Sequence, residues 1–193
     1  MHILMYGPEG SGKGTQAKLL SEKLNIPILT SGDLVREAAT NDKGHIGNVC
    51  RLALTEGKYV ADADMYALWE RKIVEVGGTA GWIMDGFPRN VEQAKFLDEK
   101  LHGLGSKVDA VVYLNISEEE SLKRLIKRAR PLIPGSTELH DSPARIKKRL
   151  AVYKEGQKDL LEYYRNKEIL QEISAEDSVE NVHNVILSRL HNG

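Results

Sequence analysis

A glycine-rich stretch near the start of the chain, residues 7–15 (GPEGSGKGT), has the residue types of a phosphate-binding loop. It follows the short apolar run 2–6 and precedes residues 16–24, where apolar residues recur at helical spacing. Glycines let the backbone turn so that successive N–H groups point at an anion, and the following helix adds its own N–H groups and dipole. Lys13 supplies a full charge for the β- and γ-phosphates. The order strand, loop and helix therefore predicts a nucleotide triphosphate site and disfavours a plain glycine turn.

One position departs from the general pattern of such loops. The pattern has Ser or Thr directly after the lysine, where the hydroxyl holds magnesium. Gly14 stands there instead, and Thr15 is the next hydroxyl.

Asp85 is a second candidate, at the end of the apolar run 82–85. In nucleotide-binding α/β proteins, an aspartate at the end of the strand beside the phosphate loop supports hydrated magnesium. An Asp before a glycine is also typical of a simple turn, so it is the pairing with the phosphate loop that favours the functional interpretation.

Alternating strand and helix patterns must position these residues. Apolar runs at 2–6, 26–29, 82–85, 110–114 and 168–173 predict five strands, and amphipathic segments between them predict helices. This alternation predicts an α/β fold: a five-stranded parallel sheet with helices on both faces, of the P-loop NTPase type. The ligand should then lie beyond the carboxyl ends of the strands.

Two stretches interrupt the alternation and are expected to cover the site as mobile lids. We expect a single domain whose core comprises residues 1–30, 61–128 and 142–193, with a nucleotide-binding insertion at 31–60 and a short lid at 129–141.

Composition narrows the class of protein. The chain has 193 residues, with 27 Lys plus Arg against 28 Asp plus Glu, so a broad basic surface for nucleic acid is not expected. Cys50 is the only cysteine and is expected to face the core; the six histidines lack metal-ligand spacing. The sequence has no apolar run near 18 residues and no leader-like start, which predicts a soluble, cytoplasmic protein without a membrane partner.

Five arginines lie next to segments at the expected ligand end of the sheet. Phosphoryl transfer needs positioning and charge neutralisation more than a base, so a ring of guanidinium groups suits it. A single arginine more often forms a surface salt bridge, so the set has to be considered together. Its members are Arg36, Arg89, Arg124, Arg128 and Arg149.

The chain resembles the adenylate kinases along nearly its whole length. Residues 7–16 are similar to the family's phosphate loop, which has Gly-Lys-Gly-Thr-Gln, so Gly14 is the family's own form. Residues 85–89 (DGFPR) match the family signature, and residues 147–150 (KKRL) resemble a helix that carries a phosphate-binding arginine, here Arg149.

The resemblance implies a set of site residues. ATP would be bound by Gly10, Ser11, Gly12, Lys13, Gly14, Thr15, Arg124 and Arg128. AMP would be bound by Ser31, Arg36, Lys58, Tyr59, Val60, Gly86, Phe87, Pro88, Arg89, Gln93 and Arg149. The catalytic set would be Lys13, Asp85, Arg89, Arg124, Arg128 and Arg149. No residue would bind the metal directly, since Mg²⁺ would be held by nucleotide and water, with Thr15 and Asp85 nearby.

The lid departs from the family pattern, which has Arg-x-Asp-Asp. Glu138 stands at the position of the arginine, and His140 and Asp141 stand at the two aspartate positions. We expect Arg145 or Arg130 to compensate for the missing charge. The short lid has no cysteines, which excludes the zinc-bearing version.

The implied function is reversible phosphoryl transfer from MgATP to AMP, giving two ADP and maintaining the adenine nucleotide balance. The protein is expected to act as a monomer. Two alternatives stay open at this point. A UMP/CMP kinase is suggested by Asn90, and a nucleotide-binding sensor of low activity is suggested by Glu138 and His140.

Overall fold

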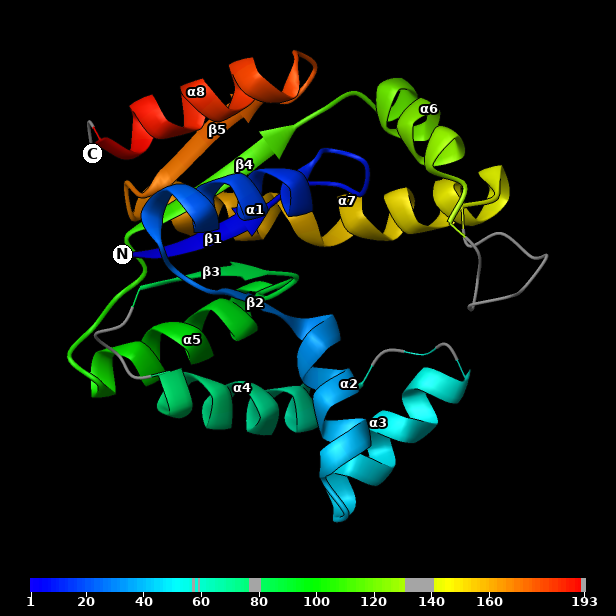
Figure 1. The fold of residues 1–193 in the computed structure, drawn as a ribbon, viewed down its shortest axis with the longest axis vertical. Helices are drawn as coiled ribbons and strands as arrows, with labels where there is room; N and C mark the ends of the chain where they lie inside the picture. Colours follow the sequence, from blue (N-terminus) through cyan, green and yellow to red (C-terminus); the bar gives the residue numbers. More distant parts are fainter. Residues whose placement is uncertain (57, 59, 77–80, 131–140, 192–193) are drawn as a thin grey trace.

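A computed structural model describes residues 1–56, 58, 60–76, 81–130 and 141–191 of the chain. Five parallel strands form one sheet in the order β2-β3-β1-β4-β5, which confirms the predicted fold class. The strands are β1 (His2–Tyr6), β2 (Ile28–Thr30), β3 (Trp82–Asp85), β4 (Ala110–Asn115) and β5 (Leu170–Ser174). β1 is central and is followed by the glycine-rich loop, so that loop leaves the middle of the sheet (Figure 1).

Eight helices among the described residues complete the fold. They are α1 (Lys13–Leu24), α2 (Ser31–Asn41), α3 (His45–Glu56), α4 (Asp62–Val76), α5 (Val91–Gly103), α6 (Glu118–Arg128), α7 (Pro143–Asn166) and α8 (Val179–His191). None of these helices combines the length and the apolar character that crossing a bilayer requires.

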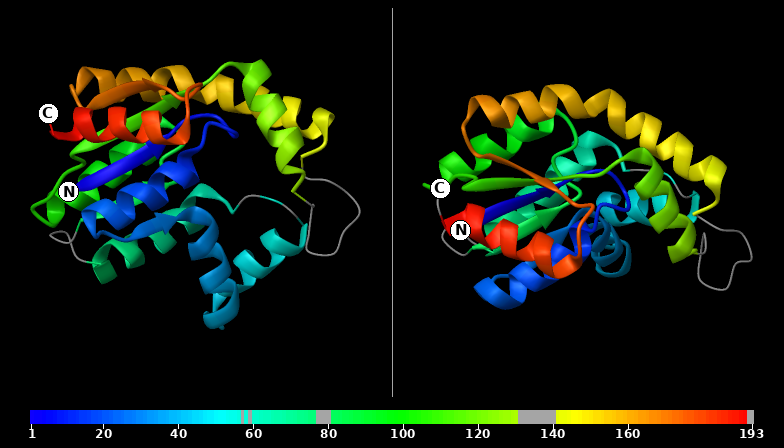
Figure 2. Two further views of the ribbon diagram at one scale, coloured as in Figure 1. Left: turned by 45° about the horizontal axis from the view of Figure 1, so that its top comes forward. Right: turned by 90° about the horizontal axis from the view of Figure 1, so that it is seen from above.

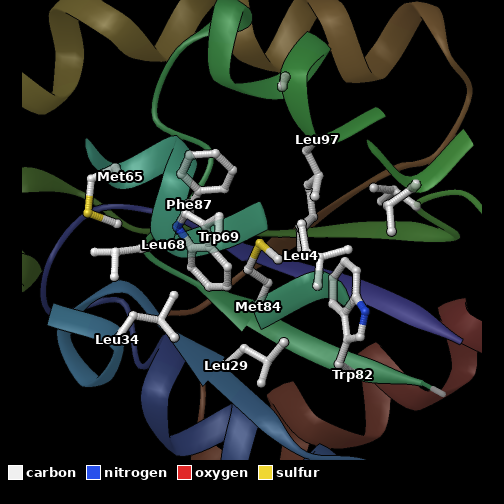
Figure 3. Packing of buried hydrophobic residues seen from close by; sticks show 14 of the residues in the cluster. Leu4, Leu29, Leu34, Met65, Leu68, Trp69, Trp82, Met84, Phe87 and Leu97 are labelled. Atoms are coloured by element: carbon white, nitrogen blue, oxygen red, sulfur yellow. The ribbon is translucent and has the colours of Figure 1, made fainter. Parts of the chain in front are cut away.

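The two faces of the sheet bury different helices, as the alternation of side chains along β1 requires. Ile3 and Met5 pack with Leu20 of α1 and Ile186 of α8. Leu4 points the other way, into the larger cluster that contains residues of α4, α5 and α7. Figure 3 shows this second cluster, where the indole of Trp69 lies beside Phe87 and Met84. Both faces of β1 are therefore covered.

The segments that reach past the sheet lie at its carboxyl edge. The α2–α3 pair projects from the body of the fold on one side, and the end of α6 with the start of α7 lies on the other (Figures 1 and 2). α2 follows directly on β2, and Cys50 of α3 is fully buried against the larger cluster, as expected. The expected lid at 129–141 falls mostly outside the described residues.

Three details differ from the sequence-based expectation. β2 begins at Ile28 rather than Ile26. Helical spacing predicts a helix from Leu34, but α2 begins at Ser31, because the Thr30 side chain caps the helix by accepting from the backbone N–H of Asp33 at 3.0 Å. The same spacing places Ile126 with Leu122 and Leu125 in the apolar stripe of α6, but 46% of Ile126 is exposed. α6 covers its neighbours chiefly through Leu125, so its buried stripe is narrower than the pattern indicates.

Candidate functional site

The glycine-rich loop fits closely between β4 and α6. Gly7 has φ +144°, and a Cβ there would lie 2.6 Å from the carbonyl oxygen of Leu114. Gly10 has φ +86°, and its Cβ would lie 3.0 Å from the carbonyl oxygen of Ser121. Ser121 of α6 holds the loop in place, because its Oγ donates to the carbonyl oxygen of Glu9 at 2.5 Å. Glycine is therefore required by both backbone angle and space.

Lys13 and Asp85 place opposite charges at the carboxyl ends of neighbouring strands. Asp85 pairs in register with Met5 at the end of β1. The Nζ of Lys13 donates to the carbonyl oxygens of Gly7 at 2.7 Å and Pro8 at 2.9 Å. Burial lowers the pKa of Lys13, against the opposing influence of Asp85. Burial likewise raises the pKa of Asp85, against the attraction of Lys13 and Arg89. Both charges are thus held where water solvates them poorly.

A cavity of 1140 Å³ opens over the loop and holds all of the residues expected at the ATP site. It is lined by Gly10, Ser11, Gly12, Lys13, Gly14, Thr15, Arg124 and Arg128, together with Asp85 and Arg130. Residues 177–179 at the start of α8 also line it, and sequence reasoning missed them. The sequence pattern could have predicted them, because this segment follows β5 and so leaves the same edge of the sheet as the phosphate loop.

A second cavity, of 460 Å³, lies on the α7 side of the loop. Arg89 and Arg149 line it, with Gly86 and Pro88 of the DGFPR segment. Tyr6, Lys148, Leu150 and Tyr153 also line it and were not expected there. Lys13 and Glu9 line both cavities, so the two spaces meet at the phosphate loop.

Two carboxylates pair with two of the arginines between these cavities. Asp141, whose side chain is 0% exposed, accepts from Nε and Nη2 of Arg128 at 2.7 and 2.9 Å and from Nη2 of Arg149 at 3.1 Å. The Nε of Arg149 also donates to Oε1 of Glu9 at 3.0 Å. The hydrogen bond with Asp141 is the main cause that raises the pKa of Arg128. Both guanidinium groups are therefore pre-oriented by carboxylates.

Arg124 contributes a charge at the rim of the larger cavity. Its Nε donates to Glu120 one helical turn earlier, at 2.8 Å. This pairing lies within α6, four residues from Arg128, so both side chains leave the same face of the helix as expected.

The residues expected on the AMP side divide between the body of the fold and the α2–α3 pair. Ser31 Oγ donates to the carbonyl oxygen of Gly86 at 3.0 Å, and Nε of Arg89 donates to the same oxygen at 2.9 Å. Arg36 pairs with Asp33 at 2.6 Å and its side chain is 61% exposed. The structure thus joins Ser31, Gly86 and Arg89, and leaves Arg36 outside both cavities.

Four further expected AMP contacts have different surroundings. Phe87 is buried in the core against Trp69, so its side chain serves packing. Val60 packs against the larger core cluster. Lys58 is exposed and pairs with Glu56. Tyr59 lies outside the described residues, as do Glu138 and His140.

Gln93 is 5% exposed and has hydrogen bonds at both ends of its amide. Its Oε1 accepts from the backbone N–H of Arg89 at 2.7 Å, and its Nε2 donates to Asp62 at 2.8 Å. The amide is thereby oriented by the DGFPR segment and by the start of α4. An adenine base would have to exchange with one of these partners.

Among the residues that the structure describes, no group of three or more His, Cys, Asp or Glu could hold a metal ion by itself. Thr15 and Asp85 both line the larger cavity and offer oxygen atoms beside the phosphate loop. An ion at this position would take its other ligands from water and from a bound phosphate.

Comparison with known proteins links this geometry to one family. The family model described as adenylate kinase matches residues 5–169. The adenylate kinase of Thermobifida fusca is 37% identical over 182 residues, covering 94% of each chain. The adenylate kinase of Leptospira biflexa (strain Patoc 1 / Ames) is 37% identical over 188 residues, covering 97% of this chain and 98% of that one. The adenylate kinase of Archaeoglobus fulgidus is 32% identical over 205 residues, covering 94% of each chain.

Proposed function

The chain belongs to the adenylate kinase family and transfers a phosphoryl group from ATP to AMP, and we propose how its own residues divide that task. The larger cavity is the donor site. Loop N–H groups between Gly10 and Thr15 surround the phosphates, and Lys13 neutralises the transferred group. Arg124 and Arg128 supply charge from α6, and residues 177–179 border the space left for the base.

The acceptor phosphate is proposed to lie in the second cavity, between Arg89 and Arg149. The insertion at 31–60 would close over the AMP and contribute Ser31, Arg36, Lys58, Tyr59 and Val60. The inner wall of the AMP site would be formed or supported by Gly86, Phe87, Pro88 and Gln93. The acceptor oxygen is already anionic, so attack on the γ-phosphorus requires no protein base. Closure of the insertion and of the short lid at 129–141 would exclude water and suppress ATP hydrolysis.

Mg²⁺ with ATP is the cofactor that we propose. Adenylate kinases use ATP with magnesium in general, and Thr15 and Asp85 offer the hydroxyl and carboxylate oxygens that this cation accepts. When bound, magnesium would neutralise charge on the phosphates. Asp85 would orient its water ligands.

The observation that carries the proposal is that Lys13 lines both cavities, with arginines on either side. A coupled assay with ATP and AMP, CMP or UMP as acceptor tests it, and AMP should turn over fastest. AMP as the slowest acceptor would favour the UMP/CMP alternative. The residue that suggested that alternative, Asn90, has a structural role, because its side chain caps α5 by accepting from the N–H of Gln93 at 2.8 Å.

The low-activity sensor makes a different prediction in the same experiment. Calorimetry would show ATP and AMP binding, while the coupled assay would show no turnover. The site disfavours this outcome, since Lys13, Asp85 and the paired Arg128 and Arg149 lie together around the two cavities.

Of the two arginines considered for the missing lid charge, we propose Arg130. It lines the donor cavity beside Arg128, whereas Arg145 is exposed on α7 and lines neither cavity. Arg130→Ala should raise the KM for ATP about tenfold, because one charge near the phosphates is lost. Arg145→Ala is the matched control and should change kcat and KM less than twofold. The reverse ranking would assign the role to Arg145.

We further propose a monomer that acts in the cytoplasm, with ATP, AMP and ADP as its small-molecule partners. Cys50, the only cysteine of the chain, is buried, so the fold requires no disulfide. Sedimentation at several concentrations tests the monomer, and a mass that doubles with concentration would contradict it.

A further inference from the structure

Glu9 puts a negative charge inside the phosphate loop, at the point where the two cavities meet. Its backbone is fixed, because its carbonyl oxygen accepts from Ser121 Oγ. Its side chain lines both cavities. A carboxylate at this place is unexpected for a site that binds polyanions, since like charges repel at short range.

The Glu9 carboxylate faces the two arginines that pair with Asp141. Oε1 accepts from Nε of Arg149 at 3.0 Å. Oε2 lies 3.7 Å from Nη2 of Arg128, which is too long for a hydrogen bond. Among the described residues this oxygen has no hydrogen-bond partner, although it is shielded from solvent. Such an arrangement leaves part of the carboxylate unsatisfied, so the cost of moving it is low.

Asp141 differs from Glu9 in how firmly it is held. It is fully buried and accepts from Arg128, from Arg149 and from the backbone N–H of Arg130 at 3.1 Å. Within the part of the chain that the structure describes, the Glu9 side chain accepts one hydrogen bond, and it is 36% exposed. Of the two carboxylates, Glu9 is therefore the one that an incoming phosphate can displace.

We propose that Glu9 is a positioning residue that holds the guanidinium group of Arg149 before nucleotide binds and competes with nucleotide phosphate for it. This inference rests on the proposed function, in which Arg149 and Arg128 bind phosphate. Arg149 gains orientation from Glu9, while the phosphates meet a like charge that weakens their binding. Weaker binding favours release of the products, which are two ADP in one direction of the reversible reaction and ATP with AMP in the other.

Glu9→Gln tests the proposal, because the amide keeps the size and the acceptor oxygen and removes only the charge. Calorimetry without magnesium should show ATP and AMP bound about tenfold more tightly by the variant than by the original protein at low salt. The difference should shrink at high salt, since screening weakens charge repulsion. Adenosine has no phosphate, so its affinity should stay the same. The KM for AMP should fall in parallel with the dissociation constant.

A loosened loop could only weaken binding, so a gain in affinity confined to the phosphorylated ligands separates competition from structural damage. Glu172→Gln is the matched control, because it breaks a surface pair with Arg165 away from both cavities, and it should leave all affinities unchanged. Glu9→Ala should act in the same direction as Glu9→Gln. Equal or weaker binding of ATP and AMP by both Glu9 variants would overturn the inference. Failure of the original protein to transfer phosphoryl from ATP to AMP would instead overturn the proposed function.

Discussion

Lys13 and Asp85 carry charges that burial disfavours, as the lowered pKa of the lysine and the raised pKa of the aspartate show. Each moderates the shift of the other, and neither removes it. A group that opposes folding in this way is retained for what it does in the site. At Lys13 and Asp85, therefore, the requirements of function and of stability conflict.

Asp85→Asn should lower kcat and change how stability depends on pH. Because the pKa of Asp85 is raised in the folded protein, the folded state binds more protons than the unfolded chain between the two pKa values. Stability then falls as pH rises through that window. The variant lacks this penalty, so its free energy of unfolding should gain on that of the original protein as pH rises from the ordinary aspartate pKa, about 4, through the raised pKa of the folded state. Urea unfolding across this range measures the difference.

Asp177→Asn is the contrasting variant for this experiment. Hydrogen bonds from the backbone of Ser178 and from Asn181 lower the pKa of Asp177. Its contribution to stability is present above the unfolded pKa and is lost as pH falls, so the difference between this variant and the original protein should shrink on acidification. If the free energy of unfolding varied with pH in the same way for both variants, the opposite pKa shifts assigned to Asp85 and Asp177 would be contradicted.

Residue types and spacing predicted Lys13, Asp85 and the arginines of α6 at one edge of the sheet, because these residues follow strand ends or share a helix face. The pairing of Glu9 with Arg149 could not be predicted in this way. The two residues are 140 positions apart, and their contact depends on how α7 packs across the loop. Burial of Asp141 between two arginines is also a tertiary property.

At the scale of elements, α2 and α3 are held together where the backbone of α3 passes very close to the backbone that follows α2. A Cβ on Gly47 of α3 would lie 1.8 Å from the carbonyl oxygen of Asp42, just after α2. Arg51 donates to the carbonyl oxygens of Ala39 and Asp42 at 2.7 and 3.0 Å, and Arg71 of α4 reaches the Asp42 side chain at 2.9 Å. This contact region between α2, α3 and α4, called the corner below, therefore joins the insertion to the body of the fold.

Gly47→Ala should loosen this corner, because the added methyl overlaps a backbone oxygen that cannot rotate away. We expect a loss of about 1–3 kcal/mol in the free energy of unfolding. The KM for AMP should rise more than that for ATP, since the insertion lies on the acceptor side. Thermal unfolding and the coupled assay measure both effects.

Gly103→Ala provides the control for Gly47→Ala. A Cβ at Gly103 of α5 has nothing within 4 Å among the described residues. This substitution should be neutral or slightly stabilising, because alanine favours helix over glycine. A Gly47→Ala protein as stable as the Gly103→Ala protein would show that the corner can relax.

Element boundaries were less predictable than the elements themselves. The apolar run that begins at Ile26 resembles a strand throughout, but pairing with β3 begins only at Ile28. The polar cluster after it could cap a helix at several positions, and the structure selects Thr30. Ile126 fits an amphipathic pattern on α6, yet it is about half exposed and belongs to none of the core clusters formed by the described residues. Local pattern shows which face is apolar, and only packing shows how much of it is buried.

At the scale of the whole molecule, two cavities share one lysine and one phosphate loop. α6 and α7, which carry arginines of the site, lie on one side of it, and the α2–α3 pair lies on the other (Figure 2). A ligand that occupies both cavities should therefore contact elements on both sides of the site, whereas a single nucleotide contacts only some of them.

A dinucleotide with two adenosines linked by five phosphates should bind one molecule per chain and stabilise the fold more than ATP or AMP alone. At a ligand concentration of 1,000 times its dissociation constant, the added stability should be about 4 kcal/mol, visible as a rise in Tm. Lys13→Met should remove most of this rise, because the shared charge at the meeting point is lost. Control Arg165→Met removes a surface charge paired with Glu172 and should leave the rise intact. Two dinucleotides bound independently per chain would mean that the cavities do not form one site, and phosphoryl transfer could not then pass directly between them.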